Sequence, residues 1–227
     1  MVWHRAERST PVTVGAAVRA FRASGSALGG RPAPGVYRYA VSGFECAGVG
    51  PVCLHRPLPH RAYLIITRHG PELTIELDLS AQHAETQRYR LTATGRMLEW
   101  QRTKLSILGV SQDDAARTVP ATLALPARLR PGLRWTQAFH ASEVRVRGRN
   151  TILPARTVTI GGRRETCLTV VADSITTGPH PGTEDDRDCI VPGSLLDVRF
   201  SIDRRITGTF PYRLRLTAVL RSLAPQR

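Results

Sequence analysis

The chain has almost no lysine and no long hydrophobic run. Lys104 is the single lysine among 32 basic Lys and Arg residues, and the formal net charge is +14. The arginines are spread along the chain, and no RNP aromatic set, KH loop, zinc finger or basic heptad accompanies them. Specific nucleic-acid binding is therefore not expected. The charge suits an anionic envelope polymer, a lipid or a membrane partner protein instead.

No apolar stretch is long enough for a signal peptide or a membrane span, and the first residues, Met1-Val-Trp-His, are followed by charges. Two expectations follow. Either an export or membrane-anchoring segment lies upstream of this start, or the protein is cytoplasmic.

Motifs of catalysis and cofactor binding are also missing. The sequence has no G-x-S-x-G elbow, G-x-G-x-x-G loop, P-loop or H-E-x-x-H pair. Six scattered histidines are interpreted as structural or exposed: His55, His60, His69, His83, His140 and His180. Asp113 and Asp114 are interpreted as an N-cap or a solvated loop, and the carboxylates of residues 184–188 as strand-edge charges or, alternatively, a site for a hard cation. We predict no enzyme activity, no catalytic residue, no cofactor and no metal site.

Cysteine is scarce, and its placement carries information. The four residues form two local pairs, Cys46 with Cys53 across a Gly/Pro turn, and Cys167 with Cys189 on either side of a turn-rich stretch. Both spacings can bring α-carbons within disulfide distance. Two disulfides are the favoured interpretation, while free buried thiols and a metal site remain alternatives, the latter without any C-x2-C spacing. Persistent disulfides predict an extracytoplasmic protein, and reduced cysteines would predict a cytoplasmic one.

From residue 35 onward, apolar and polar residues alternate. The clearest case is 73–80, and similar segments are 36–41, 61–67, 88–93, 97–108, 134–146, 157–160, 166–175, 196–202 and 210–223. Period two predicts strands with one buried face, and the Gly/Pro turns between them predict hairpins. We expect a mainly β fold: a single curved antiparallel meander forming a barrel, half-barrel or sandwich, with residues 111–131 as a long mid-loop. Trp100 and Trp135 are expected in its core.

The first residues differ from this pattern. Val14, Ala17, Val18 and Phe21 recur at helical spacing, Thr13 is a candidate N-cap and Gly25 a stop. The sequence therefore predicts residues 1–34 as a short helix and linker, and residues 35–227 as the β domain.

Several segments resemble uncharacterised actinobacterial envelope proteins, in which a membrane anchor precedes an extracytoplasmic β domain. They are residues 9–22, 34–39, 129–135, 158–163 and 216–225. Where a tryptophan is expected in such proteins, residues 188–195 carry Cys189. The resemblance implies an anchored, exported protein, and this departure supports a local Cys167–Cys189 bridge.

Two functions fit these observations. The first is a non-enzymatic cell-envelope module with a packed sheet, which contacts a polymer or partner through its arginine-rich face. The alternative is a carrier or sensor that holds an apolar ligand, such as a lipid or lipoprotein, on the concave face of a half-barrel. Bulky inward residues favour the module, whereas small or widely spaced ones would favour the carrier; the bulky ones expected here are Leu73, Ile75, Leu77, Leu98 and Trp100.

Overall fold

The computed structural model describes residues 8–49, 52–107, 109–208 and 210–227, and these form one helix and fourteen strands. The elements are α1 (Val14–Ala23), β1 (Gly35–Val49), β2 (Val52–Pro57), β3 (Arg61–His69), β4 (Glu72–Ser80), β5 (His83–Leu91), β6 (Gly95–Ile107), β7 (Val110–Pro126), β8 (Arg134–Ala141), β9 (Val144–Ile152), β10 (Arg156–Ile160), β11 (Arg163–Thr177), β12 (Gly182–Val191), β13 (Leu196–Ile206) and β14 (Tyr212–Leu220).

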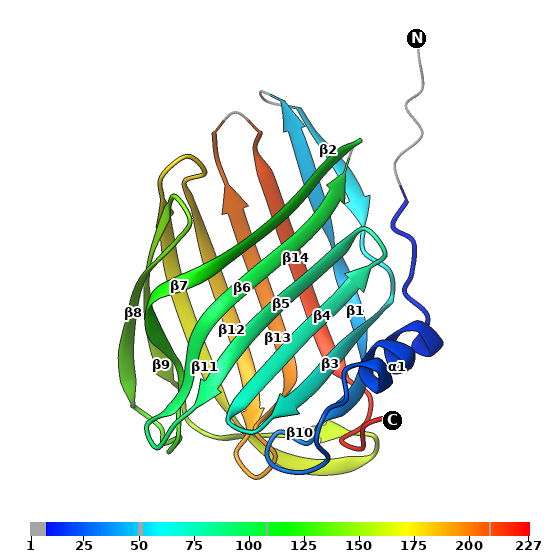
Figure 1. Ribbon diagram of the computed structural model, residues 1–227, viewed down its shortest axis with the longest axis vertical. Coiled ribbons are helices and arrows are strands. Elements are labelled where there is room, and N and C mark those ends of the chain that lie inside the picture. Colours follow the sequence, from blue (N-terminus) through cyan, green and yellow to red (C-terminus); the bar gives the residue numbers. More distant parts are fainter. Residues whose placement is uncertain (1–7, 50–51, 108, 209) are drawn as a thin grey trace.

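The strands close into an antiparallel barrel. Twelve of them pair in the order β11-β12-β13-β14-β1-β3-β4-β5-β6-β7-β8-β9, and β9 pairs back with β11 (Figure 1). β2 extends the β3 side of β1, and β10 pairs with the start of β11 at the lower end of the barrel in Figure 1. The mainly β prediction is confirmed, and closure selects the barrel among the three predicted shapes.

Buried and exposed residues alternate along each strand whose lumen-facing side is apolar. In β14, Tyr212, Leu214, Leu216, Ala218 and Leu220 are buried while the residues between them are more exposed. Because successive side chains of a strand point to opposite faces, the buried set faces the lumen. The same pattern on β1, β3 and β4 fills that half of the lumen with apolar and tyrosine side chains.

The predicted helix is confirmed as α1. Thr13 is its N-cap, with the Thr13 hydroxyl accepting a bond from the Ala16 amide at 3.2 Å, and Gly25 follows its end with a φ of 63°. Ala17 and Phe21 are buried against Val36, Tyr63 and Ile65 in a cluster separate from the lumen core; the helix therefore covers the outer face of β1 and β3 (Figure 1).

The expected mid-loop at 111–131 is wrong, because most of it belongs to β7, which pairs with β6 almost throughout. The lumen-facing residues of this strand include Gln112, Asp114 and Ala116, which line a cavity. A strand whose inner face is polar or small shows no hydrophobic alternation, which explains why the pattern was missed.

The segment 134–146 is a hairpin instead of one strand. β8 and β9 meet at Ala141 and Val144, and Ser142 takes the left-handed conformation with a φ of 52°. Residues 184–188 are likewise no edge strand, because they lie in β12, which is paired on both sides with β11 and β13.

Candidate functional site

A cavity of about 760 Å³ occupies one half of the barrel lumen. Its walls come mainly from β5 to β9 and β11 to β13, and no described residue of β1 lines it. The space exists because inward positions on these strands carry small side chains: Ala116, Ala124, Ala141, Gly148, Ala172 and Ser174. A volume of this size matches a small organic ligand.

The cavity opens at the upper end of the barrel in Figure 1. Its lining there includes Glu143 of the β8–β9 turn and the exposed Pro179 and His180 of the β11–β12 turn. At the lower end, Leu125, Ile152 and Ile190 belong to an apolar cluster against which Trp135 packs. The cavity is thus a pocket with one open end.

A chain of ion pairs crosses the lumen. Buried Arg56 donates to buried Glu45, with an Nε–Oε2 distance of 2.9 Å, and the other oxygen of Glu45 contacts His83 Nδ1. His83 Nε2 lies 3.1 Å from Glu85. Glu85 pairs with Arg204 at 2.5 Å.

Arg204 also contacts Glu184 and so ends this chain on β12. All of these residues occupy inward positions, and strands from both sides of the barrel supply them: β1, β2 and β5 on one side, and β12 and β13 on the other.

Burial and neighbouring charges set the protonation of this chain. Burial alone would lower the pKa of His83, but the hydrogen bonds and charges of Glu45 and Glu85 raise this pKa to about 9. Burial alone would raise the pKa of Glu85, but the charges of Arg204 and His83 hold it well below its usual range. The pKa of Glu45 is also lowered: contacts with His83 and Arg56 outweigh its burial. Glu45, His83 and Glu85 are therefore ionised at neutral pH.

β12 carries a second group of charges. Glu184, Asp186 and Asp188 alternate with outward Asp185 and Arg187, and all three inward carboxylates line the cavity. Burial and the neighbouring carboxylates raise the pKa of Asp186 and that of Asp188 well above the usual range. The acidic cluster of the sequence is therefore split between the lumen and the outer surface.

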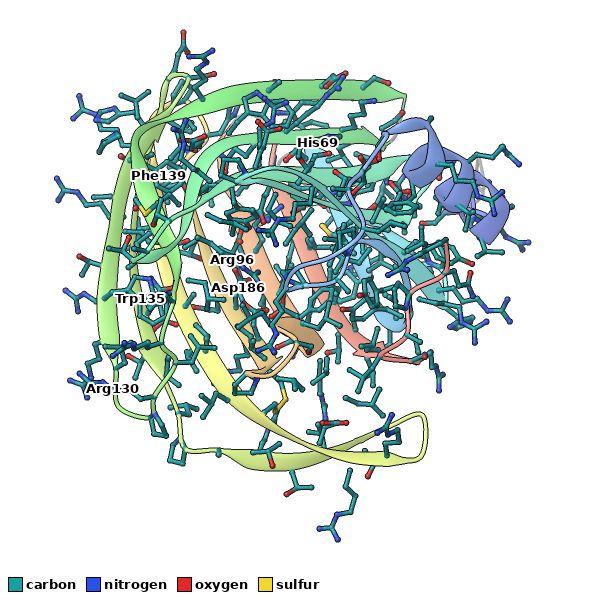
Figure 2. The ribbon with its side chains drawn as sticks, turned by 60° about the horizontal axis from the view of Figure 1, so that its bottom comes forward. His69, Arg96, Arg130, Trp135, Phe139 and Asp186 are labelled. Carbon is teal, nitrogen blue, oxygen red and sulfur yellow. A yellow bond between two sulfur atoms is a disulfide. The ribbon has the colours of Figure 1, made fainter. Side chains whose placement is uncertain are left out.

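Arg96 and Asp197 lie at the closed end of the cavity, where Figure 2 shows Arg96 inside the ring of strands. The Arg96 guanidinium donates to the carbonyl of Leu195 at 2.6 Å, across the lumen from β6 to the β12–β13 turn. Burial raises the pKa of Asp197 to about 6, although the Arg96 charge acts in the opposite direction.

Four buried polar atoms that line the cavity have no hydrogen-bond partner among the described residues. They are Arg96 Nε, Asn150 Nδ2, Asp186 Oδ1 and the Tyr212 hydroxyl. Buried polar groups in folded proteins are almost always satisfied, so each of these atoms needs an explanation such as water or a ligand.

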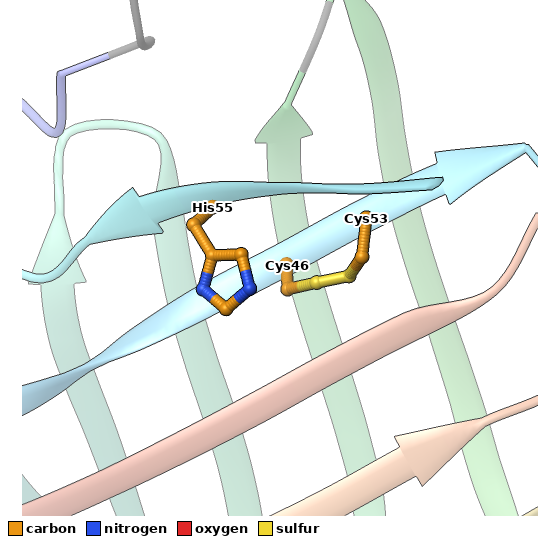
Figure 3. Close-up of side chains that lie close together, drawn as sticks. All are labelled: Cys46, Cys53 and His55. Carbon is orange, nitrogen blue, oxygen red and sulfur yellow. A yellow bond between two sulfur atoms is a disulfide. The ribbon is translucent and has the colours of Figure 1, made fainter. Parts of the chain in front are cut away.

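The four cysteines pair as Cys46–Cys53 and Cys167–Cys189, with α-carbons 5.6 and 5.5 Å apart. The turn at 50–51 between the first two lies outside the described residues. His55 lies beside the first pair, and its ring nitrogen and the two sulfurs are within 4.8 Å of one another (Figure 3). Metals bind thiolates and not disulfide sulfurs, so this trio offers one ligand in its oxidised form.

The remaining sequence candidates lie apart from the cavity chemistry or play structural parts in it. Asp113 is in a strand rather than a loop and pairs with Arg102 at 2.6 Å. Trp100 is not in the core as expected, because a bulge turns it outward, where Arg88 lies 4.9 Å from its ring centre. His83 is buried and structural, as sequence interpretation allowed; nothing in its local sequence indicates its two carboxylate partners.

Comparison with protein-family models and with curated proteins gives no match. Among solved structures, the hypothetical lipoprotein YmcC from Escherichia coli K12 has a TM-score of 0.39 and 12% identity, over 84% of this chain and 86% of that one. This similarity is too low to assign a family. The resemblance to actinobacterial envelope proteins stays a prediction.

In the described part of the chain, no helix has the length and apolarity needed to cross a membrane.

Proposed function

We propose that this protein is a non-catalytic, extracytoplasmic binding protein that carries or senses a small organic ligand inside its barrel. The cavity of about 760 Å³ carries this proposal. The size of the inward side chains separates a packed module from a carrier. Both occur here: bulky Leu73 and Leu79 in the filled half, and small Ala172 and Ser174 in the open half.

The contacts of His83 support the non-catalytic part of the proposal. A general base for a nucleophile needs one ring nitrogen free to accept the proton from a hydroxyl or thiol. Both nitrogens of His83 contact carboxylates, those of Glu45 and Glu85. The described members of this chain of ion pairs contact one another, and these contacts join strands of the barrel.

The cysteine pairs support the extracytoplasmic part, because disulfides persist in oxidising compartments. The anchored state expected from the sequence belongs to this proposal as well. If the purified protein carried four free thiols, the placement would revert to the cytoplasm.

Native mass spectrometry of the exported protein tests the proposal. We expect a non-covalent mass that is lost on denaturation, and four cysteines that resist alkylation until reduced. The variant Ala172→Phe adds a bulky ring to the cavity wall and should remove the bound mass, whereas Thr136→Phe on the outer face of β8 should retain it. Absence of any bound mass, together with no uptake of a neutral apolar dye by the wild type, would contradict ligand binding.

The outer surface favours the module as a second candidate. Arg145, Arg147 and Arg149 lie on the exposed face of β9, and the ion pairs of the described residues include none of them. Such a column attracts an anionic polymer. Binding of polyphosphate that falls with salt and is lost in R145Q/R147Q/R149Q, but is kept in R199Q, would support this function. Equal binding by both variants would oppose it.

A further inference from the structure

More carboxylates than cationic side chains line the cavity. Glu184 and Glu85 share Arg204, and the charge of Arg96 acts on Asp197. Among the ion pairs of the described residues, none includes the other two inward carboxylates of β12, Asp186 and Asp188, although the charge of Arg204 also acts on Asp186. This acidic lumen lies within a chain whose net charge is +14, so it does not follow from the overall composition.

Strand register places a second polar residue level with Asp186. Ala172 of β11 is paired with Asp186 on one side and with Asn150 of β9 on the other. Neighbouring side chains across strands are about 5 Å apart, so Asn150 and Asp186 stand roughly 10 Å apart on either side of an alanine. A ligand group over Ala172 can contact both.

The unsatisfied polar atoms of Asn150 and Asp186 are a second observation, which does not depend on the number of charges in the cavity. Asn150 is 4% exposed, lines the cavity and has an amide nitrogen with no acceptor among the described residues. Asp186 shares a hydrogen bond with Glu184 through its carboxyl group, but its Oδ1 atom has no partner. Figure 2 shows Asp186 inside the ring of strands. Asn150 thus offers a hydrogen-bond donor and Asp186 an acceptor, on either side of Ala172, with room between them for a group of a ligand.

A divalent metal fits this arrangement poorly. The described residues contain one group of three potential ligand atoms within 4.8 Å of one another, and it is the Cys46, Cys53 and His55 trio. The carboxylates of β12 are spread along the strand, two residues apart. An elongated organic ligand can contact them in succession, whereas a single ion cannot gather them.

We propose that the cavity binds an organic cation with an apolar body, its ammonium group at Asp186 and Asp188 and a neighbouring oxygen accepting from Asn150. This inference rests on the proposed ligand-binding function and names the class of ligand. The cationic nitrogen supplies the partner that these carboxylates lack. The apolar body lies against the side chains that surround the cavity, among them Leu98, Phe139 and Ile202.

Protonation links binding to pH. Burial and mutual repulsion raise the pKa of Asp186 and Asp188, so the empty barrel holds protons on these carboxyls. An ammonium group beside them favours their ionised forms. Binding of the cation therefore releases protons, whereas binding of a neutral ligand of the same length does not.

Three probes with the same eight-carbon chain test the proposal by calorimetry: 2-(octylamino)ethanol as the cation, 1-octanol as the neutral form and octanoate as the anion. We expect the cation to bind at least tenfold more tightly than the other two, with proton release seen as a dependence of the heat on the buffer. Asp186→Asn and Asp188→Asn should each weaken cation binding about tenfold without weakening octanol binding. Asp185→Asn, on the outer face of the same strand, should change neither.

The outcomes separate this inference from the proposed function. Equal or tighter binding of octanol or octanoate would overturn the cation and leave ligand binding intact. Failure of all three probes would also overturn it, and the bound mass of the exported protein then decides the proposed function by itself. Retention of full cation affinity in both asparagine variants would overturn the assigned residues. Because asparagine has nearly the shape of a protonated aspartate, unchanged melting temperatures are expected and are checked in parallel.

Discussion

Arg204 on β13 and Glu85 on β5 form an ion pair across the lumen, at 2.5 Å, although four strands separate β13 from β5 on the shorter side of the barrel. The pair divides the interior. On the β1 side the lumen is filled by apolar and tyrosine side chains, and on the other side it is open. The cavity therefore exists beside a complete core, and ligand binding does not require the core to open.

Removal of Arg204 should strongly destabilise the fold. Arg204→Met leaves the partly buried Glu85 and Glu184 without their shared cation, although Glu85 keeps its contact with His83. Loss of one partner from a fully buried ion pair costs about 3–5 kcal/mol, so we expect a cost near the lower end of that range. The free energy of unfolding in urea measures this. The triple variant R204M/E85Q/E184Q removes the stranded charges and should recover most of the loss.

Arg205→Met is the matched control. Arg205 is an exposed neighbour whose pairing with Asp203 is long, at 3.6 Å, so we expect a change below about 1 kcal/mol. If R204M were as stable as R205M, the cross-lumen pair would have no part in holding the two halves together.

Stability should fall as pH rises from about 4 to 9. Asp197 has a pKa of about 6 in the folded protein against an ordinary 3.8, and His83 about 9 against 6.5. A raised pKa means that the folded state binds the proton more tightly. Its contribution is therefore complete below the unfolded pKa and is lost as pH rises through the folded one. The Asp197 contribution disappears between about pH 4 and 6, and that of His83 between about 6.5 and 9.

Thermal unfolding across this range checks both windows. Asp197→Asn should make the decline between about pH 4 and 6 shallower without abolishing it, because Asp186 and Asp188 also have raised pKa values. Asp185→Asn, on the outer face of β12, is the control and should leave the slope of the wild type. Below about pH 4 the trend reverses, because Glu45 and Asp203 have lowered pKa values and lose their ion pairs on protonation. A wild-type curve that is flat from pH 4 to 9 would contradict these assignments.

Sequence patterns predicted the elements with apolar interiors and several strands that line the cavity, such as β6, β11 and β13, but missed β7 and β12. β4, β14 and α1 show regular hydrophobic spacing because their inner faces meet a packed core. The inner faces of β7 and β12 carry polar side chains that line the cavity, namely Gln112, Asp114, Glu184 and Asp186. Along these strands polar residues therefore stand at the inward positions, and apolar and polar residues do not alternate. The two strands with the most polar inner faces in the candidate site therefore carry the weakest strand signature.

The site itself depends on contacts between distant segments. Glu85 and Arg204 are 119 residues apart, and Asn150 meets the level of Asp186 only through the register of β9, β11 and β12. Neither local spacing nor composition encodes barrel closure. The alternation of Glu184, Asp186 and Asp188 was the one available sign, since three carboxylates at period two must share a face.

The two disulfides should differ in their effect on stability. In the chain-entropy model, loops with sequence separations of 7 and 22 give about 2.5 and 3.4 kcal/mol for Cys46–Cys53 and Cys167–Cys189. Urea unfolding of C46A/C53A and C167A/C189A should follow that order. Cys53 is exposed, whereas Cys167 and Cys189 are both fully buried. Mild dithiothreitol should therefore reduce the Cys46–Cys53 disulfide well before the Cys167–Cys189 disulfide. Reduction at equal rates would mean that the lower barrel opens readily.

Gly43 should be the glycine least tolerant of substitution in β1. Its φ is 137°, and an added Cβ would lie 2.0 Å from the carbonyl oxygen of Arg215 on β14. That carbonyl belongs to the ladder that joins the two strands, where Gly43 faces Leu216, so it cannot move without breaking the pairing. Gly43→Ala should therefore cost several kcal/mol, well above the ordinary effect of a surface substitution.

Gly193→Ala is the matched control. Gly193 lies in the exposed β12–β13 turn, where an added Cβ would have no atom within 4 Å, so this substitution should be nearly neutral. The difference in urea midpoint between the two variants is the measurement. If G43A unfolded at the same midpoint as G193A, β1 and β14 would not approach as closely as described, and the packed half of the lumen that they form would be looser than its buried tyrosines and leucines indicate.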